Sequence, residues 1–343
     1  MSSARNVTNR NELVSADQAT GGRPRVFVMR KLPDATERQL RERYDVALNP
    51  TDQTIPAATV VDAARTFDAI VSSVVDDVPD AVFSVNPRRL RIVANYGVGF
   101  DRIDVRAARA HGVVVTNTPG VLTEDTADLA MLLLLAAARR VSEAERELRA
   151  GHWNGWRPTH MLGTRVNGGV LGIVGFGRIG AAVARRAYRG FEMRVMFVNP
   201  SAPDPQAVAD ANATRCVSLE EMLPLSDFVS LHAPSRPETR QLLDARRLAL
   251  MRPGAILVNT ARGDLIDETA VFDALESGAL AAAGLDVYQG EPRVSDRLLG
   301  LRNVVLLPHI GSATTTSRVA MGDRVLANLD AFFAGAEPPD RLA

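Results

Sequence analysis

The stretch that decides the fold is "GVLGIVGFGRIGAAVARRA", residues 169–187. An apolar run typical of a buried strand leads into three glycines in G-x-G-x-x-G spacing, and an Ala-rich helical segment follows. In that context the first glycine permits a tight turn, the second lets the backbone approach a pyrophosphate, and the third lets helix and strand pack closely. The helix amino terminus offers unpaired N–H groups to the phosphates. We therefore expect this turn to bind a dinucleotide through Gly175, Phe176, Gly177, Arg178, Ile179 and Gly180.

Apolar strands alternate with helical segments on both sides of this turn. The expected strands cover residues 25–30, 67–73, 91–97, 112–117, 169–175, 194–199, 214–219, 227–233, 255–261, 282–287 and 303–308. Continuous apolar strands separated by helices are typical of parallel sheets covered on both faces. The sequence therefore predicts an α/β protein with two Rossmann-like domains, whose parallel sheets are flanked by helices.

Three helices carry specific expectations. Asp34, with Glu37 three residues later, has the spacing of a capping box and predicts a helix that Asp34 caps. Residues 123 to about 150 read as one long helical stretch, and residues 314–335 as one amphipathic helix. The apolar block 129–138 is too short to span a bilayer, so we expect it to be buried between domains or subunits.

Composition excludes several classes of protein. The 343 residues include 40 basic and 40 acidic side chains, which gives no reason to expect a nucleic acid or membrane partner. The single cysteine, Cys216, permits no intrachain disulfide and fits the cytoplasm. Residues 1–24 are polar and lack an apolar signal core, so we expect a disordered extension. We expect no metal.

The end of the second strand of the nucleotide-binding region bears on the cofactor. Asn199 lies nineteen residues after Gly180, where an NAD site usually has an acidic residue that accepts from the ribose 2′-hydroxyl. Asparagine can bond that hydroxyl but lacks the charge that would repel a 2′-phosphate. The following "NPSAP" supplies no arginine to grip a phosphate, although Ser201 can donate a hydrogen bond. The cofactor is therefore expected to be NAD or NADP, with the preference open.

Polar side chains follow several strands of the second region. In an open parallel sheet, ligands bind outside the carboxyl ends of the strands. A nicotinamide enzyme acting on a 2-oxo acid needs a cation for the substrate carboxylate, an acid for the carbonyl oxygen, and a carboxylate that orients the acid. A lone histidine after an apolar run is more often structural. The other polar residues expected at this edge favour a catalytic role for His309. The residues at the edge are His232, Thr260, Arg262, Asp286, Glu291 and His309.

Six motifs extend this interpretation: "NYGVGFDRIDV", "GIVGFGRIG", "LHAPSRPETR", "NTARGDLIDE", "AGLDVYQGEP" and "LLPHIGSAT". Over about residues 25–335 the chain resembles the D-2-hydroxyacid dehydrogenases, and "GHWNGWRP" resembles their glyoxylate/hydroxypyruvate reductase branch. The resemblance implies that Arg262, Glu291 and His309 are catalytic. It implies a substrate-binding loop of Tyr96, Gly97, Val98 and Gly99. It also implies a cofactor site that includes Thr126, Asn199, His232, Ala233, Pro234, Thr260, Ala261, Asp286 and Gly311.

The resemblance also implies a domain plan and a reaction. A substrate domain, residues 25–118, is interrupted by a nucleotide-binding domain, residues 119–310, and is completed by residues 311–343. The implied reaction reduces a small 2-oxo acid to a 2-hydroxy acid in a homodimer that pairs through residues 127–138. Three alternatives stay open: a 3-phosphoglycerate dehydrogenase-type activity, which Arg102 would serve; a non-enzymatic NADH-sensing protein; and a dinucleotide-binding protein of another specificity.

Overall fold

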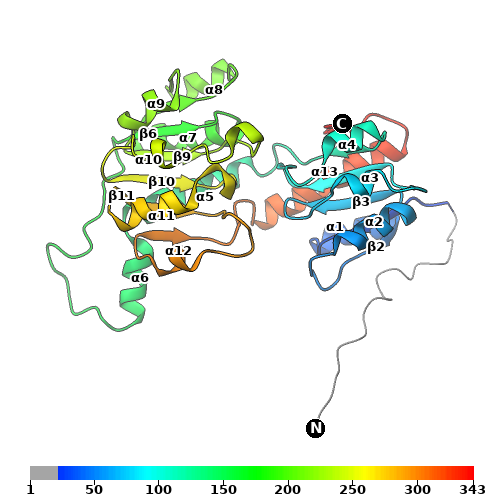
Figure 1. Ribbon diagram of the computed structural model, residues 1–343, viewed down its shortest axis with the longest axis horizontal. Coiled ribbons are helices and arrows are strands. Elements are labelled where there is room, and N and C mark those ends of the chain that lie inside the picture. Colours follow the sequence, from blue (N-terminus) through cyan, green and yellow to red (C-terminus); the bar gives the residue numbers. More distant parts are fainter. Residues whose placement is uncertain (1–21) are drawn as a thin grey trace, which may run out of the picture. The chain divides into compact units, whose positions relative to one another are not determined.

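The computed structural model describes residues 22–343, so the expectation for the first 24 residues lies almost wholly outside the described residues. The chain divides into two compact units. Unit 1 runs to Val121 and resumes at Thr314–Ala343, and unit 2 is Leu122–Ala313 (Figure 1). The boundaries between the two units, after Val121 and after Ala313, lie three residues after the predicted domain boundaries at 118 and 310. No helix among residues 22–343 is long and apolar enough to cross a membrane.

Unit 1 is built on a five-stranded parallel sheet in the order β2-β1-β3-β4-β5. Its strands are β1 Arg25–Val28, β2 Asp45–Ala47, β3 Ala69–Ser73, β4 Ile92–Tyr96 and β5 Val114–Thr116. Its helices are α1 Asp34–Arg43, α2 Ala57–Thr66, α3 Asp80–Phe83, α4 Val105–Ala110 and α13 Thr315–Phe333. Helix α13 packs against β4 and α1, so the last segment of the chain completes the first unit.

Two features of unit 1 differ from the sequence prediction. Strand β2 was not expected, because three half-buried residues form no apolar run; the strand exists through parallel pairing with β1. The predicted capping box is wrong, because the N-cap of α1 is Pro33 and no side chain caps the helix. The Glu37 carboxylate instead accepts a hydrogen bond from the Leu32 N–H at 3.1 Å and one from Lys31 Nζ at 2.8 Å.

Unit 2 carries a seven-stranded parallel sheet in the order β12-β11-β10-β9-β6-β7-β8. Its strands are β6 Val170–Val174, β7 Arg194–Val198, β8 Thr214–Arg215, β9 Phe228–Leu231, β10 Ala255–Asn259, β11 Leu280–Leu285 and β12 Val304–Leu306. Its α-helices are α5 Thr123–Ala138, α6 Val141–Arg149, α7 Arg178–Phe191, α8 Pro205–Asp210, α9 Leu219–Met222, α10 Ala245–Leu248, α11 Glu268–Glu276 and α12 Asp296–Gly300, with short 3₁₀ turns at Leu223–Leu225, Pro237–Thr239 and Gly263–Leu265. The predicted α/β class with parallel sheets is confirmed.

Helix α5 lies against this sheet. It packs on β10, β11 and α7, and Leu133 and Leu134 are fully buried. A Cβ at Gly284 of β11 would lie 2.9 Å from the Leu133 Cβ, so the absence of a side chain there lets helix and sheet approach. The predicted single helix to about residue 150 is wrong. It ends at Ala138, and α6 begins after Arg140, which adopts a left-handed conformation (φ 55°) and redirects the chain.

Candidate active site

The predicted residues of unit 2 gather at one edge of its sheet. All strands of this sheet run parallel, so their carboxyl ends lie together. The glycine-rich turn follows β6, Asn199 follows β7, His232 follows β9, Thr260 to Arg262 follow β10, Asp286 follows β11 and His309 closely follows β12. The predicted substrate loop, residues 96–99, begins with the last residue of β4 and so lies at the carboxyl edge of the separate sheet of unit 1.

The glycine-rich turn has the shape a pyrophosphate requires. Gly175 has φ 92°, and a Cβ there would lie 2.8 Å from the Ala233 nitrogen. A Cβ at Gly180 would lie 2.1 Å from the Gly175 carbonyl oxygen, whereas one at Gly177 would meet no atom within 4 Å. Gly177 is the N-cap of α7, and no side chain caps the first amides of this 14-residue helix. These residues fit a nicotinamide dinucleotide, whose phosphates such an end can hold.

Asn199 is hydrogen-bonded within the protein. Its Oδ1 accepts from the Phe176 N–H at 2.9 Å. Its Nδ2 donates to the Ser201 carbonyl at 2.9 Å and to Ser201 Oγ at 3.3 Å. The carbonyl oxygen of Asn199 accepts from the Arg215 guanidinium at 2.8 Å. The asparagine thus ties the glycine-rich turn to the residues after β7, and Arg215 arrives from the neighbouring strand β8, a contact no local motif reveals.

Two polar side chains face the same edge from β9 and β10. The imidazole Nε2 of His232 lies 2.8 Å from Ser230 Oγ, and desolvation lowers the pKa of His232 to about 4. The histidine is therefore neutral at physiological pH. Thr260 is 9% exposed, and its Oγ1 is buried without a hydrogen-bond partner in the described part of the chain. A buried hydroxyl in that state is suited to a polar ligand group.

His309 and Glu291 form a hydrogen-bonded pair. His309 Nδ1 lies 2.8 Å from Glu291 Oε2, and the other carboxylate oxygen accepts from the Tyr288 N–H at 2.9 Å. Burial alone would raise the pKa of the Glu291 carboxyl, but the bond from His309, the Tyr288 N–H and the nearby Arg262 charge together lower it. The carboxylate is thus ionised and fixed at both oxygens. Within residues 22–343, nothing is hydrogen-bonded to His309 Nε2, and 28% of the side chain is exposed.

Asp286 holds the turn that carries His309. This fully buried side chain accepts from the Ile310 N–H through Oδ1 and from the Gly311 N–H through Oδ2, both at 2.8 Å. The His309 N–H donates to the Asp286 carbonyl at 2.9 Å, and His309 has φ 55°. Burial raises the pKa of Asp286, while these N–H groups and His309 oppose the rise. Both oxygens are used in the turn, so Asp286 serves to shape it, which the motif alone did not indicate.

Thr126 and Gly311 complete this corner. Thr126 Oγ1 donates to the Gly311 carbonyl at 3.1 Å, which joins the first turn of α5 to the histidine turn. A Cβ at Gly311 would lie 3.3 Å from both Asp286 Oδ2 and Thr126 Cγ2. The two predicted residues are therefore in direct contact although 185 positions separate them in the chain.

Arg262 is fixed close to the Glu291 turn by backbone packing. Its guanidinium Nη1 donates to the Ala261 carbonyl at 2.8 Å, and its carbonyl accepts from Asn259 Nδ2 at 2.8 Å. The next residue, Gly263, lies so close to Tyr288 that a Cβ would be 2.0 Å from the Tyr288 carbonyl carbon. The arginine, the glutamate and the histidine therefore share one rigid edge of unit 2.

The loop after β4 in unit 1 has its carbonyl groups turned inward. Asn95 Nδ2 donates to the carbonyls of Gly97 at 3.0 Å and Gly99 at 2.8 Å, and Asn117 Nδ2 donates to the Val98 carbonyl at 2.9 Å. The Gly97 N–H donates to the Asn95 carbonyl, whereas the N–H groups of Val98 and Gly99 have no acceptor among the described residues. The loop can therefore present two amide donors to an anion. The motif did not indicate that Asn95 and Asn117 hold the loop in this way.

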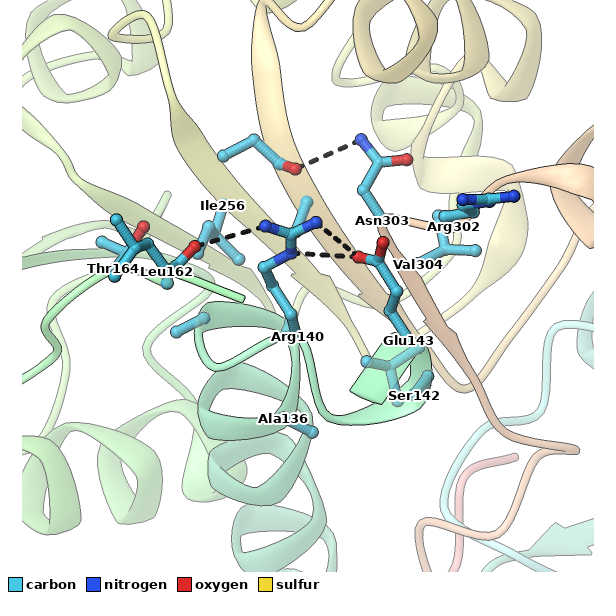
Figure 2. A pocket seen from close by; sticks show the side chains of 16 residues that line it. Ala136, Arg140, Ser142, Glu143, Leu162, Thr164, Ile256, Arg302, Asn303 and Val304 are labelled. Carbon is cyan, nitrogen blue, oxygen red and sulfur yellow. Dashed lines mark hydrogen bonds and ion pairs between the residues drawn. The ribbon is translucent and has the colours of Figure 1, made fainter. Parts of the chain in front are cut away.

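A cavity of about 330 Å³ lies at the opposite edge of the unit 2 sheet. It is lined by the end of α5, residues 162–164 and the amino ends of β10, β11 and β12 (Figure 2). Arg140 points across it to Glu143, at 2.8 Å, and to the Leu162 carbonyl, at 3.4 Å. None of the predicted catalytic or cofactor residues lines this cavity.

Residues 131–311 match the NAD-binding domain of the D-isomer specific 2-hydroxyacid dehydrogenases. The chain belongs to this family of dehydrogenases. It is 47% identical to a glyoxylate reductase of Thermococcus kodakarensis over 321 residues, which cover 92% of this chain and 95% of the relative. It is 39% identical to a glycerate dehydrogenase of Hyphomicrobium methylovorum, with coverages of 93% and 99%.

A solved structure of the same family is similar along almost the whole chain. It is an NADPH-dependent glyoxylate/hydroxypyruvate reductase from Sinorhizobium meliloti in complex with NADP and malonate, with a TM-score of 0.84 and 36% identity. The match covers 94% of this chain and 97% of that one. This 2-hydroxyacid dehydrogenase is therefore an oxidoreductase acting on CH–OH groups, with NAD or NADP as cofactor.

Proposed function

We propose that the enzyme reduces a small 2-oxo acid of the glyoxylate or hydroxypyruvate type, with His309 as the general acid. The observation that carries the proposal is the pair of His309 Nδ1 and Glu291 Oε2 at 2.8 Å, on the edge that also carries Arg262 and the phosphate turn. When bound, the nicotinamide supplies a hydride to the substrate C2. The residues of the chain then have to hold the substrate and deliver one proton to its carbonyl oxygen.

His309 delivers that proton from Nε2. Glu291 engages Nδ1 and fixes the orientation of the ring, so Nε2 is the nitrogen left to face the substrate. The Tyr288 N–H holds the second oxygen of Glu291, and Asp286 holds the two amides that follow the histidine. The acid is thereby kept in one orientation, and such preorganisation is what a proton transfer in the transition state requires.

Arg262 binds the substrate carboxylate in this proposal. A guanidinium pairs with a carboxylate through two parallel hydrogen bonds and fixes its direction. In unit 1, the predicted substrate-binding loop suits a carboxylate through the N–H groups of Val98 and Gly99, because the carbonyls of the loop are tied inward by Asn95 and Asn117. Gly97 serves the loop by its size, since a Cβ there would lie 2.1 Å from Val74 Cγ1.

A 3-phosphoglycerate-type substrate would need additional cations near this loop. Arg102 was the residue that favoured it, but its Nη1 donates to Asp77 Oδ1 at 2.9 Å, so a carboxylate already compensates its charge. Arg30, after β1, is likewise paired with the buried Asp76 at 2.8 Å. These ion pairs favour a substrate without a phosphate.

We also propose a cytoplasmic homodimer. In Figure 1, α6 and the chain that follows it project from the body of unit 2. Six large apolar side chains are exposed on α5, on α6 and on this following chain: Leu132, Val141, Leu148, Trp153, Trp156 and Leu162. Exposed apolar area of this kind marks a protein interface. Arg140, through Glu143 and Leu162, fixes the base of this projection (Figure 2). The lone cysteine, Cys216, is buried and consistent with a reducing compartment.

The test follows NADH and NADPH oxidation separately with glyoxylate, hydroxypyruvate, pyruvate and 3-phosphohydroxypyruvate. The proposal predicts turnover of the first two with kcat/KM at least about tenfold above that of the phosphorylated acid. Faster turnover of 3-phosphohydroxypyruvate, or no turnover of any of the four, would contradict it. Light scattering of the same preparation tests the dimer.

A further inference from the structure

The edge of the nucleotide site at the ends of β7 and β8 presents a positive charge. The Arg215 guanidinium donates from Nη2 to the Asn199 carbonyl at 2.8 Å. In the described part of the chain it makes no other hydrogen bond or ion pair, so its other N–H donors face solvent. This is the edge where a Rossmann-type site reads the adenosine ribose.

No carboxylate occupies the position that would repel a phosphate there. Asn199, at the end of β7, is neutral, and its amide is fully used between Phe176 and Ser201. Two acids lie on nearby segments, and each already accepts a backbone hydrogen bond: Glu221 from the Val217 N–H at 2.7 Å, and Asp204 from the Gln206 N–H at 3.0 Å. The side chain of Asn199 therefore holds the glycine-rich turn and is not available to bind the ribose hydroxyl.

Ser201 adds a neutral donor at the same end of β7. Its Oγ accepts from Asn199 Nδ2 at 3.3 Å, which leaves its own proton for an acceptor outside the protein. Ser201 and Arg215 are both exposed and both hydrogen-bonded to Asn199. Asn199 therefore links both side chains to the end of β7, and a guanidinium together with a hydroxyl can donate several hydrogen bonds to a phosphate monoester.

We infer that Arg215 and Ser201 bind the 2′-phosphate of NADP and that the enzyme prefers NADP to NAD. The inference rests on the proposed function, because it assigns a cofactor preference to that same site. It depends on two adjacent strands, since Asn199 removes the repelling charge from β7 and Arg215 supplies the attracting charge from β8. This explains why "NPSAP" alone left the preference open.

The test measures binding of two nucleotides that differ only in the 2′-phosphate. Isothermal titration of the full chain with 2′,5′-ADP and with 5′-AMP is expected to give about tenfold or more tighter binding of 2′,5′-ADP. Added salt should shrink that ratio, since an exposed charge pair is screened. Equal affinities, or tighter binding of 5′-AMP, would overturn the inference.

Three variants locate the effect. Arg215→Ala should reduce the affinity ratio to near one and leave 5′-AMP binding unchanged. Arg194→Ala is the matched control, because Arg194 is an exposed arginine at the opposite end of β7, and it should keep the parental ratio. Asn199→Asp keeps the acceptor for Phe176 but adds a negative charge, so the ratio should fall below the parental value. A parental ratio in Arg215→Ala would contradict the assignment.

Activity separates this inference from the proposed function. Reduction of glyoxylate with NADH at least as efficient as with NADPH, together with equal nucleotide affinities, would refute the cofactor preference and leave the reaction standing. A preserved 2′,5′-ADP preference without turnover of any 2-oxo acid would refute the reaction and leave the phosphate site standing.

Discussion

The contact between Gly263 and Tyr288 makes a sharp prediction, because it sets Arg262 against the turn of Glu291. A Cβ added at residue 263 would lie 2.0 Å from the Tyr288 carbonyl carbon and 2.2 Å from its oxygen. Both are backbone atoms and cannot rotate away. Ordinary van der Waals contact begins at 3.4 Å, so Gly263→Ala forces the two segments apart by about 1.4 Å.

The expected cost has two parts. Overpacking of this kind destabilises a fold by about 1–3 kcal/mol. A misplacement of about 1 Å between groups that act together lowers turnover by about 10²-fold. We therefore expect Gly263→Ala to fold with a lower melting temperature and to lose about two orders of magnitude in kcat/KM for glyoxylate, with nucleotide binding at the separate phosphate turn changed little.

The control is Gly190→Ala in α7, where an added Cβ meets no atom within 4 Å. Alanine is also the better helix former by about 0.5–1 kcal/mol, so this variant should be as stable as the parent or more so, with parental activity. Steady-state kinetics, thermal unfolding and nucleotide titration of both variants make the comparison. Parental kcat/KM in Gly263→Ala would refute the idea that this contact sets the geometry of the site.

Two further predictions concern the histidine turn. Asp286→Asn removes one acceptor from the Ile310 and Gly311 amides but also removes a buried charge. We therefore expect the free energy of unfolding to fall by about 1 kcal/mol and the free-energy barrier to turnover to rise by more than that. An unchanged kcat would show that Asp286 does not hold the turn. Glu291 has a lowered pKa in the folded protein, so its contribution to stability is complete above its unfolded pKa, about 4.3, and is lost as pH falls through the lower folded pKa. The difference in free energy of unfolding between the parent and Glu291→Gln should therefore be constant at neutral pH and should disappear in acid. A difference that grows on acidification would contradict a lowered pKa of Glu291.

The parts of the fold that the sequence predicted are those with local signals. Continuous apolar strands and the glycine-rich turn are readable along the chain, and so is the final amphipathic helix, α13. Strand β2 was missed because its stability comes from pairing with β1, and the break at Arg140 was missed because no glycine or proline marks it. The predicted capping box at Asp34 is wrong because the Glu37 carboxylate accepts hydrogen bonds from Lys31 Nζ and the Leu32 N–H instead.

The site shows the same division. Motif spacing pointed to His309 and Glu291, and the structure brings them within hydrogen-bond distance. The contacts that hold them were not predicted: those of the Tyr288 N–H, of both Asp286 oxygens, and of Gly263 against Tyr288. These contacts depend on how neighbouring strand ends meet. Arg215 is a further case, because its partner Asn199 follows another strand, β7, and sixteen positions separate the two residues.

The most direct test of the central claim is the turnover of His309→Ala with glyoxylate, measured beside its nucleotide affinity. If His309 is the general acid held by Glu291, kcat should fall by a factor of about 10² or more while nucleotide binding stays nearly parental. Turnover equal to that of the parent enzyme would remove His309 from the mechanism and contradict the account.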